Sequence, residues 1–260
     1  HDLHGQTLGD GLLDETARGQ HFVVGMRRQD QDPVIVGQRQ LGTIGRAGRR
    51  RRIVDEVGGG GRHLVRAAGR DDGQRRGEAC PVFYRHDRFT EIGSGTFWLS
   101  ATPDIPGSVG WGAALTRIAT WVRLYDKTVS DTICYFNTHF DHISDSARVM
   151  SSGVLLDRVR EIAGDNNFVI TGDFNALPGS LAITRMKEGG FAIDTYLISE
   201  TPPAGESYTF NGWREVQGEG RIDYIFVRAG MKAHSHHTWR VIKDGIFISD
   251  HWPVTATVGY

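Results

Sequence analysis

Short apolar runs that stop at polar residues recur through the second two thirds of the chain. The clearest occupies residues 168–171 and is followed by Gly172, Asp173 and Asn175. Four β-prone residues in a row predict a buried strand. A carboxylate and a carboxamide at its carboxyl end are typical of sites in open α/β folds, although Gly, Asp and Asn also favour ordinary turns.

The same pattern predicts the neighbouring elements. Further strands are predicted at residues 81–84, 96–99, 118–124, 133–136 and 221–227. Apolar residues at 155, 159 and 162 have helical spacing and predict a helix over 149–162, with Gly164 as its C-cap. This helix joins a strand that ends near His139 to the strand that ends at Asp173. A second, short helix is predicted near 181–186.

The first quarter of the chain has a different composition. Residues 1–78 carry a net charge of +3, whereas residues 79–260 carry −4. Residues 1–68 are rich in Gly and Arg and have only short apolar pieces, so they can bury little surface. Such a segment is expected to be disordered or poorly folded, and a reading-frame shift in the gene or divergent evolution accounts for its composition. A basic arm that binds nucleic acid is a third interpretation, but acids and glycines interrupt the arginines.

Length and cysteine content set further limits. A chain of 260 residues with 39% hydrophobic content can bury a sizeable core and is expected to have one catalytic domain. It has no apolar run of the roughly 18 residues that a membrane span needs. Cys80 and Cys134 are too few for a disulfide framework and fit no zinc pattern. We therefore expect a soluble monomer, with its compartment undetermined.

Six polar side chains at the ends of apolar runs suggest one kind of chemistry. They are Asp173, Asn175, Asp223, Asp250, His139 and His251. Oxygen and imidazole groups suit a hard divalent cation and proton transfer, which is what phosphoester hydrolysis needs. Each residue alone also has a structural interpretation, as a loop pair, a strand-end ion pair or a packed histidine. Their recurrence at strand ends favours a shared site.

Four short motifs carry a family resemblance. In chain order they are Asn137-Thr138-His139, Gly172-Asp173-Phe174-Asn175, Arg221-Ile222-Asp223-Tyr224 and Ser249-Asp250-His251. This series resembles the endonuclease/exonuclease/phosphatase superfamily, specifically a bacterial branch, over about residues 69–260. The resemblance implies a deoxyribonuclease I-like catalytic domain. Its fold is an α/β four-layer sandwich of two packed β-sheets flanked by helices, with the site at one end of the sheets.

The resemblance also implies roles for individual residues. His251 matches the histidine at the scissile phosphate, and Asp223 matches the carboxylate that fixes its tautomer. Asp173 and Asn175 match the pair that orients water and holds phosphate or metal. Either His251 or Asp173 takes the proton from water.

Further matches complete the implied site. His139 and Glu78 match the second histidine and its carboxylate, and Asp250 matches a ligand for magnesium, with manganese as an alternative. Arg117 is a candidate phosphate contact, and a surface ion pair is its other interpretation.

Some family positions differ in this chain. The asparagine and the Gln-Glu pair that supply the family's metal site have no clear counterpart before residue 69, and Glu56 is the nearest candidate ligand. The family's Trp-Asp dipeptide is Trp111-Gly112 here. Two functions therefore remain open. One is a magnesium-dependent phosphoesterase acting on a small molecule or a nucleic acid, and the other is an impaired or inactive binding module of the same fold.

Overall fold

The computed structural model describes residues 21–26, 34–39, 64–67, 71–73, 77–214, 218–247 and 249–259. Along the chain these residues form β1 (His21–Met26), β2 (Val34–Arg39), β3 (Leu64–Ala67), β4 (Val82–Arg85), β5 (Phe89–Trp98), β6 (Ile118–Asp126), β7 (Asp131–His139), α1 (Asp145–Ala163), β8 (Asn167–Asp173), α2 (Leu181–Lys187), the 3-10 helix η2 (Glu188–Gly190), β9 (Ala192–Asp194), α3 (Thr195–Ile198), β10 (Ala204–Gly205), β11 (Asp223–Arg228), β12 (Lys232–Thr238), β13 (Ile242–Lys243), β14 (Ile246–Phe247) and β15 (Val254–Gly259).

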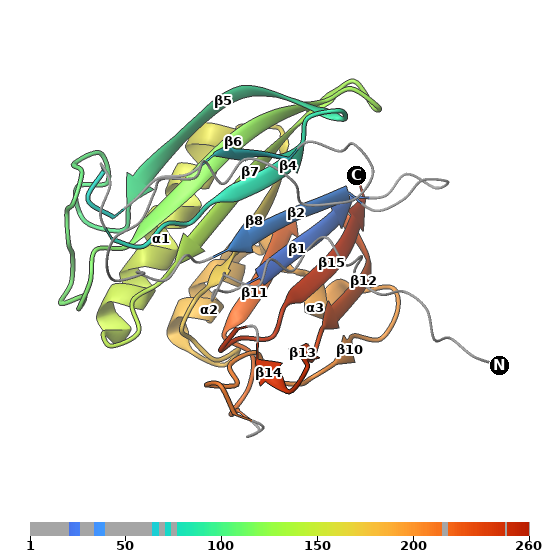
Figure 1. Cartoon of the computed structure of the whole chain (residues 1–260). Helices are drawn as coiled ribbons and strands as arrows, with labels where there is room; N and C mark the ends of the chain where they lie inside the picture. The colour runs from blue at the N-terminus through green and yellow to red at the C-terminus, as the bar shows by residue number, and fades with distance from the viewer. Residues whose placement is uncertain are drawn as a thin grey trace, which may run out of the picture.

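Two β-sheets make up most of the described structure (Figure 1). One has the strand order β10-β12-β15-β1-β2-β4-β3, and the other has the order β5-β6-β7-β8-β11-β9. In the second sheet β7 and β8 are parallel and are joined by α1, while β11 runs antiparallel to β8. The carboxyl ends of β7 and β8 therefore meet the start of β11 at one edge, where the candidate residues lie.

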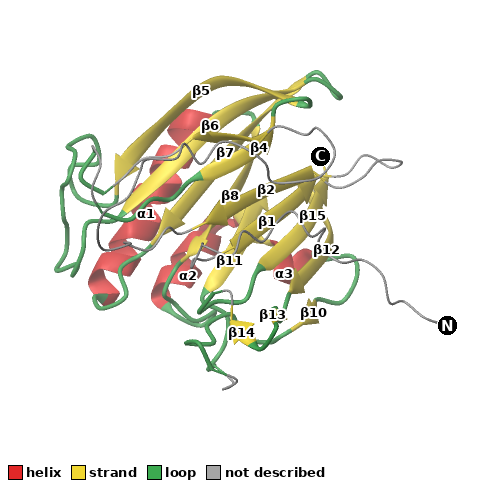
Figure 2. Ribbon diagram, viewed as in Figure 1, coloured by secondary structure: helices red, strands yellow, loops and turns green. Residues whose placement is uncertain are grey.

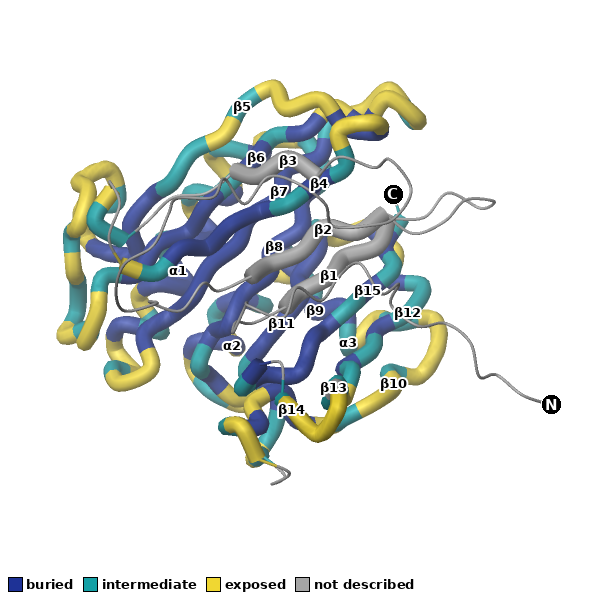
Figure 3. The backbone as a smooth tube through the Cα atoms, in the orientation of Figure 1, coloured by how far each residue is buried: buried dark blue, intermediate teal, exposed yellow. Residues whose placement is uncertain are grey.

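The interior between the sheets is apolar. On β15 every second residue is buried, and Val254, Ala256 and Val258 face the same core as Val122 of β6 and Val169 of β8. This alternation is the expected period of a strand with one buried face. Figure 3 shows the resulting band of buried strands through the centre of the molecule.

The outer face of the six-stranded sheet is covered by α1 and α2 (Figure 2). Leu155 and Val159 of α1 belong to this second core, which confirms the predicted helical face. The helix starts earlier than predicted because the Ser144 side chain accepts a hydrogen bond from the Ala147 backbone N–H, and it ends at Gly164 as expected. The short α3 contacts β11 of one sheet and β12 of the other.

The α/β architecture of two packed sheets is confirmed. Among the described helices, α1 and α2 pack on the six-stranded sheet, and α3 contacts strands of both sheets. β1, β2 and β3 all lie before residue 69 and belong to that sheet. The sequence did not predict them, because their apolar stretches are short and interrupted. The domain boundary at residue 69 stays a prediction.

Candidate active site

Three strand ends bring three predicted residues side by side. His139 ends β7 and Asp173 ends β8, and these two residues are partners in the parallel register. Asp223 begins β11 and is the antiparallel partner of Asp173. Thr209 fixes the start of β11, since its hydroxyl accepts from the backbone N–H groups of Ile222 (2.9 Å) and Asp223 (3.2 Å). These three residues of the site thus lie at the ends of adjacent strands.

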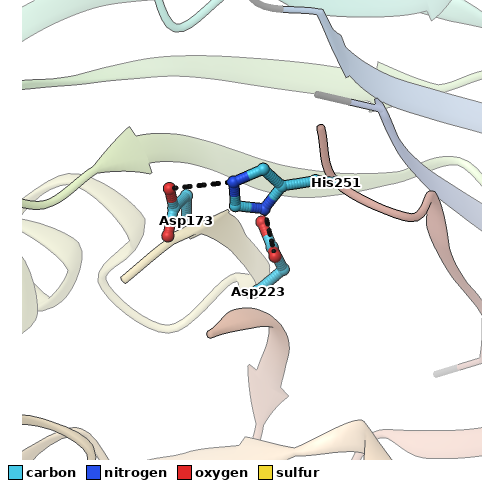
Figure 4. A group of neighbouring side chains, drawn as sticks. All are labelled: Asp173, Asp223 and His251. Carbon is cyan, nitrogen blue, oxygen red and sulfur yellow. Dashed lines mark hydrogen bonds and ion pairs between the residues drawn. The ribbon is translucent and has the colours of Figure 1, made fainter. Parts of the chain in front are cut away.

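His251 reaches this edge from the other sheet, in the segment that leads into β15. Its Nδ1 lies 2.7 Å from Asp223 Oδ2, and its Nε2 lies 3.9 Å from Asp173 Oδ2 (Figure 4). The Phe210 ring and the imidazole pack in a T-shaped arrangement, with 5.0 Å between ring centroids. The predicted pairing of His251 with Asp223 is therefore present in the structure.

The second histidine approaches Asp173 from the neighbouring strand β7. His139 Nε2 is 3.2 Å from Asp173 Oδ2, and His139 Nδ1 is 3.1 Å from Glu78 Oε2. Arg117 joins this group, because its Nη1 donates to Glu78 Oε2 at 2.5 Å. Asp173 consequently lies between two histidines, each of which has its own carboxylate partner.

Burial and charge set the protonation of these groups. Burial alone would lower the pKa of His251, but the charge and hydrogen bond of Asp223 raise it to about 9. Burial also opposes protonation of His139, yet Asp173 and Glu78 raise its pKa. For Glu78, burial would raise the pKa, whereas His139 and Arg117 lower it to about 2. Both histidines are therefore favoured as cations. Burial raises the pKa of Asp223, although the positive charge of His251 opposes that rise.

Asn175 turns the chain directly after the site. Its backbone N–H donates to Asp173 Oδ1 (2.8 Å), and its side-chain amide donates to the Phe140 carbonyl (3.0 Å). Its φ of 46° is in the left-handed region, which asparagine tolerates better than most residues. The Asn175 amide is thereby tied to the loop after His139, and its backbone is tied to Asp173.

The oxygen groups of this cluster fit a divalent metal ion. Ligand atoms of Asp173, Asp223 and His251 all lie within 4.8 Å of one another, and within the described part of the chain Asp223 Oδ1 is buried without a hydrogen-bond partner. Asp250 is half-buried beside His251, and its charge contributes to the raised pKa of that histidine. Carboxylate oxygens are the ligands that magnesium and manganese prefer. Glu56, the remaining predicted ligand, lies outside the described residues.

Arg117 is more enclosed than a phosphate contact usually is. It is 4% exposed, and its guanidinium contacts Glu78, His139 and His142. A position inside the cluster indicates that it holds other side chains in place. His142 and Phe210 were not predicted as parts of the site. The sequence signal for His142 is its position three residues after His139, but sequence spacing does not show which side chains Arg117 reaches.

The two packed sheets with their covering helices define a fold of the deoxyribonuclease I-like type. The chain belongs to the Endonuclease/Exonuclease/phosphatase family, whose profile matches residues 29–251. A search of curated proteins gave no match. Among the described residues, no helix combines the length and apolar character needed to cross a bilayer.

Solved structures with this fold include two bacterial proteins of moderate identity. An endonuclease/exonuclease/phosphatase from Bacteroides vulgatus is 35% identical, with 75% of this chain and 76% of that chain covered and a TM-score of 0.71. A mannosyl-6-phosphatase from Bacteroides thetaiotaomicron is 31% identical, with 76% and 77% covered and a TM-score of 0.69. TDP2 from D. rerio, at 15% identity and a TM-score of 0.58 over 76% and 77%, shares the fold alone.

Proposed function

We propose that the chain is a phosphoesterase that uses a divalent metal ion, magnesium or manganese, and hydrolyses a phosphomonoester or phosphodiester. The observation that carries this proposal is the position of Asp173 between His139 and His251, each held by its own carboxylate. Buried charges cost free energy unless they are paired. A module that only binds would be more stable with apolar residues at these positions, so the cluster favours catalysis over an inactive relic.

Each group has a defined part in the proposed reaction. Asp173 orients a water molecule and accepts its proton as the water oxygen bonds to phosphorus. His251, held as a cation by Asp223, faces an oxygen of the phosphoryl group and stabilises its growing negative charge. The ester P–O bond breaks, and the departing alcohol takes a proton from His139.

A bound metal would complete the charge balance of this site. Asp250 and Asp173 would hold it, with Asn175 and water as further oxygen ligands. When bound, it would neutralise charge on the phosphate. With two carboxylates and no described counterpart of the family's asparagine and Gln-Glu pair, we expect weak and highly hydrated binding of magnesium.

The substrate class we favour is a small sugar phosphate. The 31%-identical neighbour from Bacteroides thetaiotaomicron is named a mannosyl-6-phosphatase, and the net charge of −4 over residues 79–260 disfavours a broad duplex-DNA surface. Hexose 6-phosphates therefore come first among the substrates to be tested.

A substrate panel with added metal tests the proposed function. Hexose 6-phosphates, bis(p-nitrophenyl) phosphate and single-stranded DNA would be incubated with magnesium, with manganese and with EDTA. We expect phosphoester hydrolysis that EDTA abolishes and that is lost in His251→Asn. Hydrolysis by His251→Asn at the wild-type rate, or no hydrolysis by the wild type with either metal, would contradict the proposal.

A further inference from the structure

His142 is an exposed histidine beside the candidate active site that has no part in the proposed reaction. Arg117 Nη2 donates a hydrogen bond to His142 Nδ1 over 3.1 Å. The other end of the same guanidinium contacts Glu78 and lies 3.1 Å from His139 Nδ1. His142 is therefore separated from the second catalytic histidine by a single buried side chain.

The hydrogen bond with Arg117 determines where His142 carries its proton. A guanidinium can only donate, so His142 Nδ1 must accept through its lone pair. A neutral imidazole that accepts at Nδ1 has its hydrogen at Nε2. His142 is exposed as a residue, so its ring lies at the solvent-facing edge of the site.

The backbone that carries His142 is held firmly by its neighbour. Asp141 is 1% exposed, and its Oδ1 accepts from the N–H groups of Ile143 (3.0 Å) and Ser144 (2.8 Å). Its Oδ2 accepts from Ala114 (2.9 Å) and, over 3.3 Å, from the next backbone N–H. A surface histidine normally has free rotamers, whereas this one is fixed through both its backbone and its ring. Preorganised donors of this kind are typical of binding sites.

Arg117 and His142 together offer a donor without adding uncompensated charge. The guanidinium is paired with Glu78 and lies 3.9 Å from Asp141, so two carboxylates surround it. The His142 ring, which accepts from Arg117 at Nδ1, adds a single N–H donor to this group. The ligand that best matches such a donor beside cationic histidines is an anionic oxygen.

We propose that His142 is a substrate-binding residue whose Nε2–H donates to an oxygen of the substrate's phosphoryl group. The inference rests on the proposed phosphoesterase function and deepens it. Arg117 is then a positioning residue, because it sets the tautomer of His142 and holds Glu78 against His139. Loss of the His142 contact would weaken binding of phosphate and substrate more than it would slow the chemical step.

Three substitutions separate a substrate contact from a purely structural role. His142→Gln places an amide N–H near the position of Nε2, His142→Asn places an acceptor near the position of Nδ1, and His142→Ala keeps neither. His86→Gln is the matched control, since His86 is exposed in the β4–β5 turn at the far end of the sheet. The readouts are kcat, KM and the inhibition constant of inorganic phosphate.

For a substrate contact we expect His142→Ala and His142→Asn to raise KM and the phosphate inhibition constant about tenfold, with kcat changed much less. His142→Gln should stay near the wild type. Recovery by Asn instead of Gln would assign His142 to holding Arg117, and any other pattern across the three variants would also overturn the proposal.

A second measurement keeps this test independent of the proposed function. Binding of inorganic phosphate, with magnesium present, would be measured by titration calorimetry on the same proteins. If the wild type hydrolyses no substrate but binds phosphate in the predicted order of variants, the proposed function fails and the role of His142 stands. If the wild type hydrolyses substrates but His142→Ala binds phosphate equally well, the role of His142 is wrong. Absence of both binding and hydrolysis would overturn both.

Discussion

Asp173 and Asp223 are two buried carboxylates that face each other across neighbouring strands. They are 2% and 0% exposed and are partners in the β8–β11 register. Two like charges so close together in a protein interior repel each other and favour protonation of one of them. His139 and His251 supply the compensating positive charge, so each histidine stabilises the cluster as well as having a role in the proposed reaction.

Removal of the Asp223 charge should stop turnover while leaving the fold intact. Asp223→Asn keeps the size of the side chain but takes away the charge that orients His251 and holds it as a cation. We expect kcat to fall by about 10²- to 10⁴-fold, the range for a lost acid–base partner. Far-UV circular dichroism should be unchanged. Asp165→Asn, at an exposed position, is the control, and a variant within tenfold of wild-type kcat would show that the pairing is not used.

The raised pKa of His251 also predicts how stability depends on pH. Because its pKa is about 9 in the folded state and near 6.5 in the unfolded chain, the pair with Asp223 stabilises fully below pH 6.5. That contribution is lost as pH rises through about 9. Urea unfolding at pH 6, 8 and 9.5 should show this loss in the wild type and a weaker dependence in Asp223→Asn. Equal pH dependence in the two proteins would contradict the pairing.

At the scale of elements, the close approach of β7 and β8 holds His139 beside Asp173. A Cβ atom added at Gly172 would lie 2.4 Å from the Thr138 carbonyl oxygen, a backbone atom that cannot move away alone. Gly172→Ala should therefore push the two strands apart.

We expect Gly172→Ala to lower the free energy of unfolding by about 1–3 kcal/mol, the usual cost of overpacking, and to reduce kcat. Chemical denaturation and steady-state kinetics measure the two effects. Gly179→Ala is the matched control, because a Cβ at Gly179 meets nothing within 4 Å. Equal stability of the two variants would show that the strands adapt without strain.

The elements that carry the site could be predicted from the sequence, because their apolar patterns are long and end at polar motifs. α1 and β8 follow such patterns closely. Short elements such as α3 and β9 could not be predicted, since tertiary contacts decide them. The pairing of Asp223 with His251 was implied by family resemblance. The contacts of Arg117 with His139 and His142 depend on how the sheet edge brings separate segments together, which the sequence pattern does not encode.

At the scale of the whole molecule, the first strand of the chain lies in the middle of its sheet. β1 pairs with β15 on one side and with β2 on the other. β15 carries Val254, Ala256 and Val258 of the central core and follows directly from His251. β1 and β2, which lie before residue 69, therefore support the strand that leads from the candidate site.

A chain shortened to residues 69–260 should consequently fail to fold. It would lose β1, β2 and β3 and leave one edge of β15 without partners, which favours aggregation. Size-exclusion chromatography and circular dichroism would compare it with the full chain. A shortened chain that is monomeric, folded and as active as the full chain would instead support an independent domain that begins at residue 69.

The hydrogen bond between His251 and Asp223 joins the two sheets, since one residue precedes β15 and the other begins β11. Its geometry therefore depends on how the sheets are seated on each other. A shift of about 1 Å in a reacting group can lower the rate about a hundredfold. Such a displacement is far smaller than the disruption that unfolds either sheet. Hydrostatic pressure and dilute urea weaken the packing between the sheets. We expect them to abolish turnover before secondary structure is lost. Loss of turnover would thus report a small displacement of one sheet relative to the other.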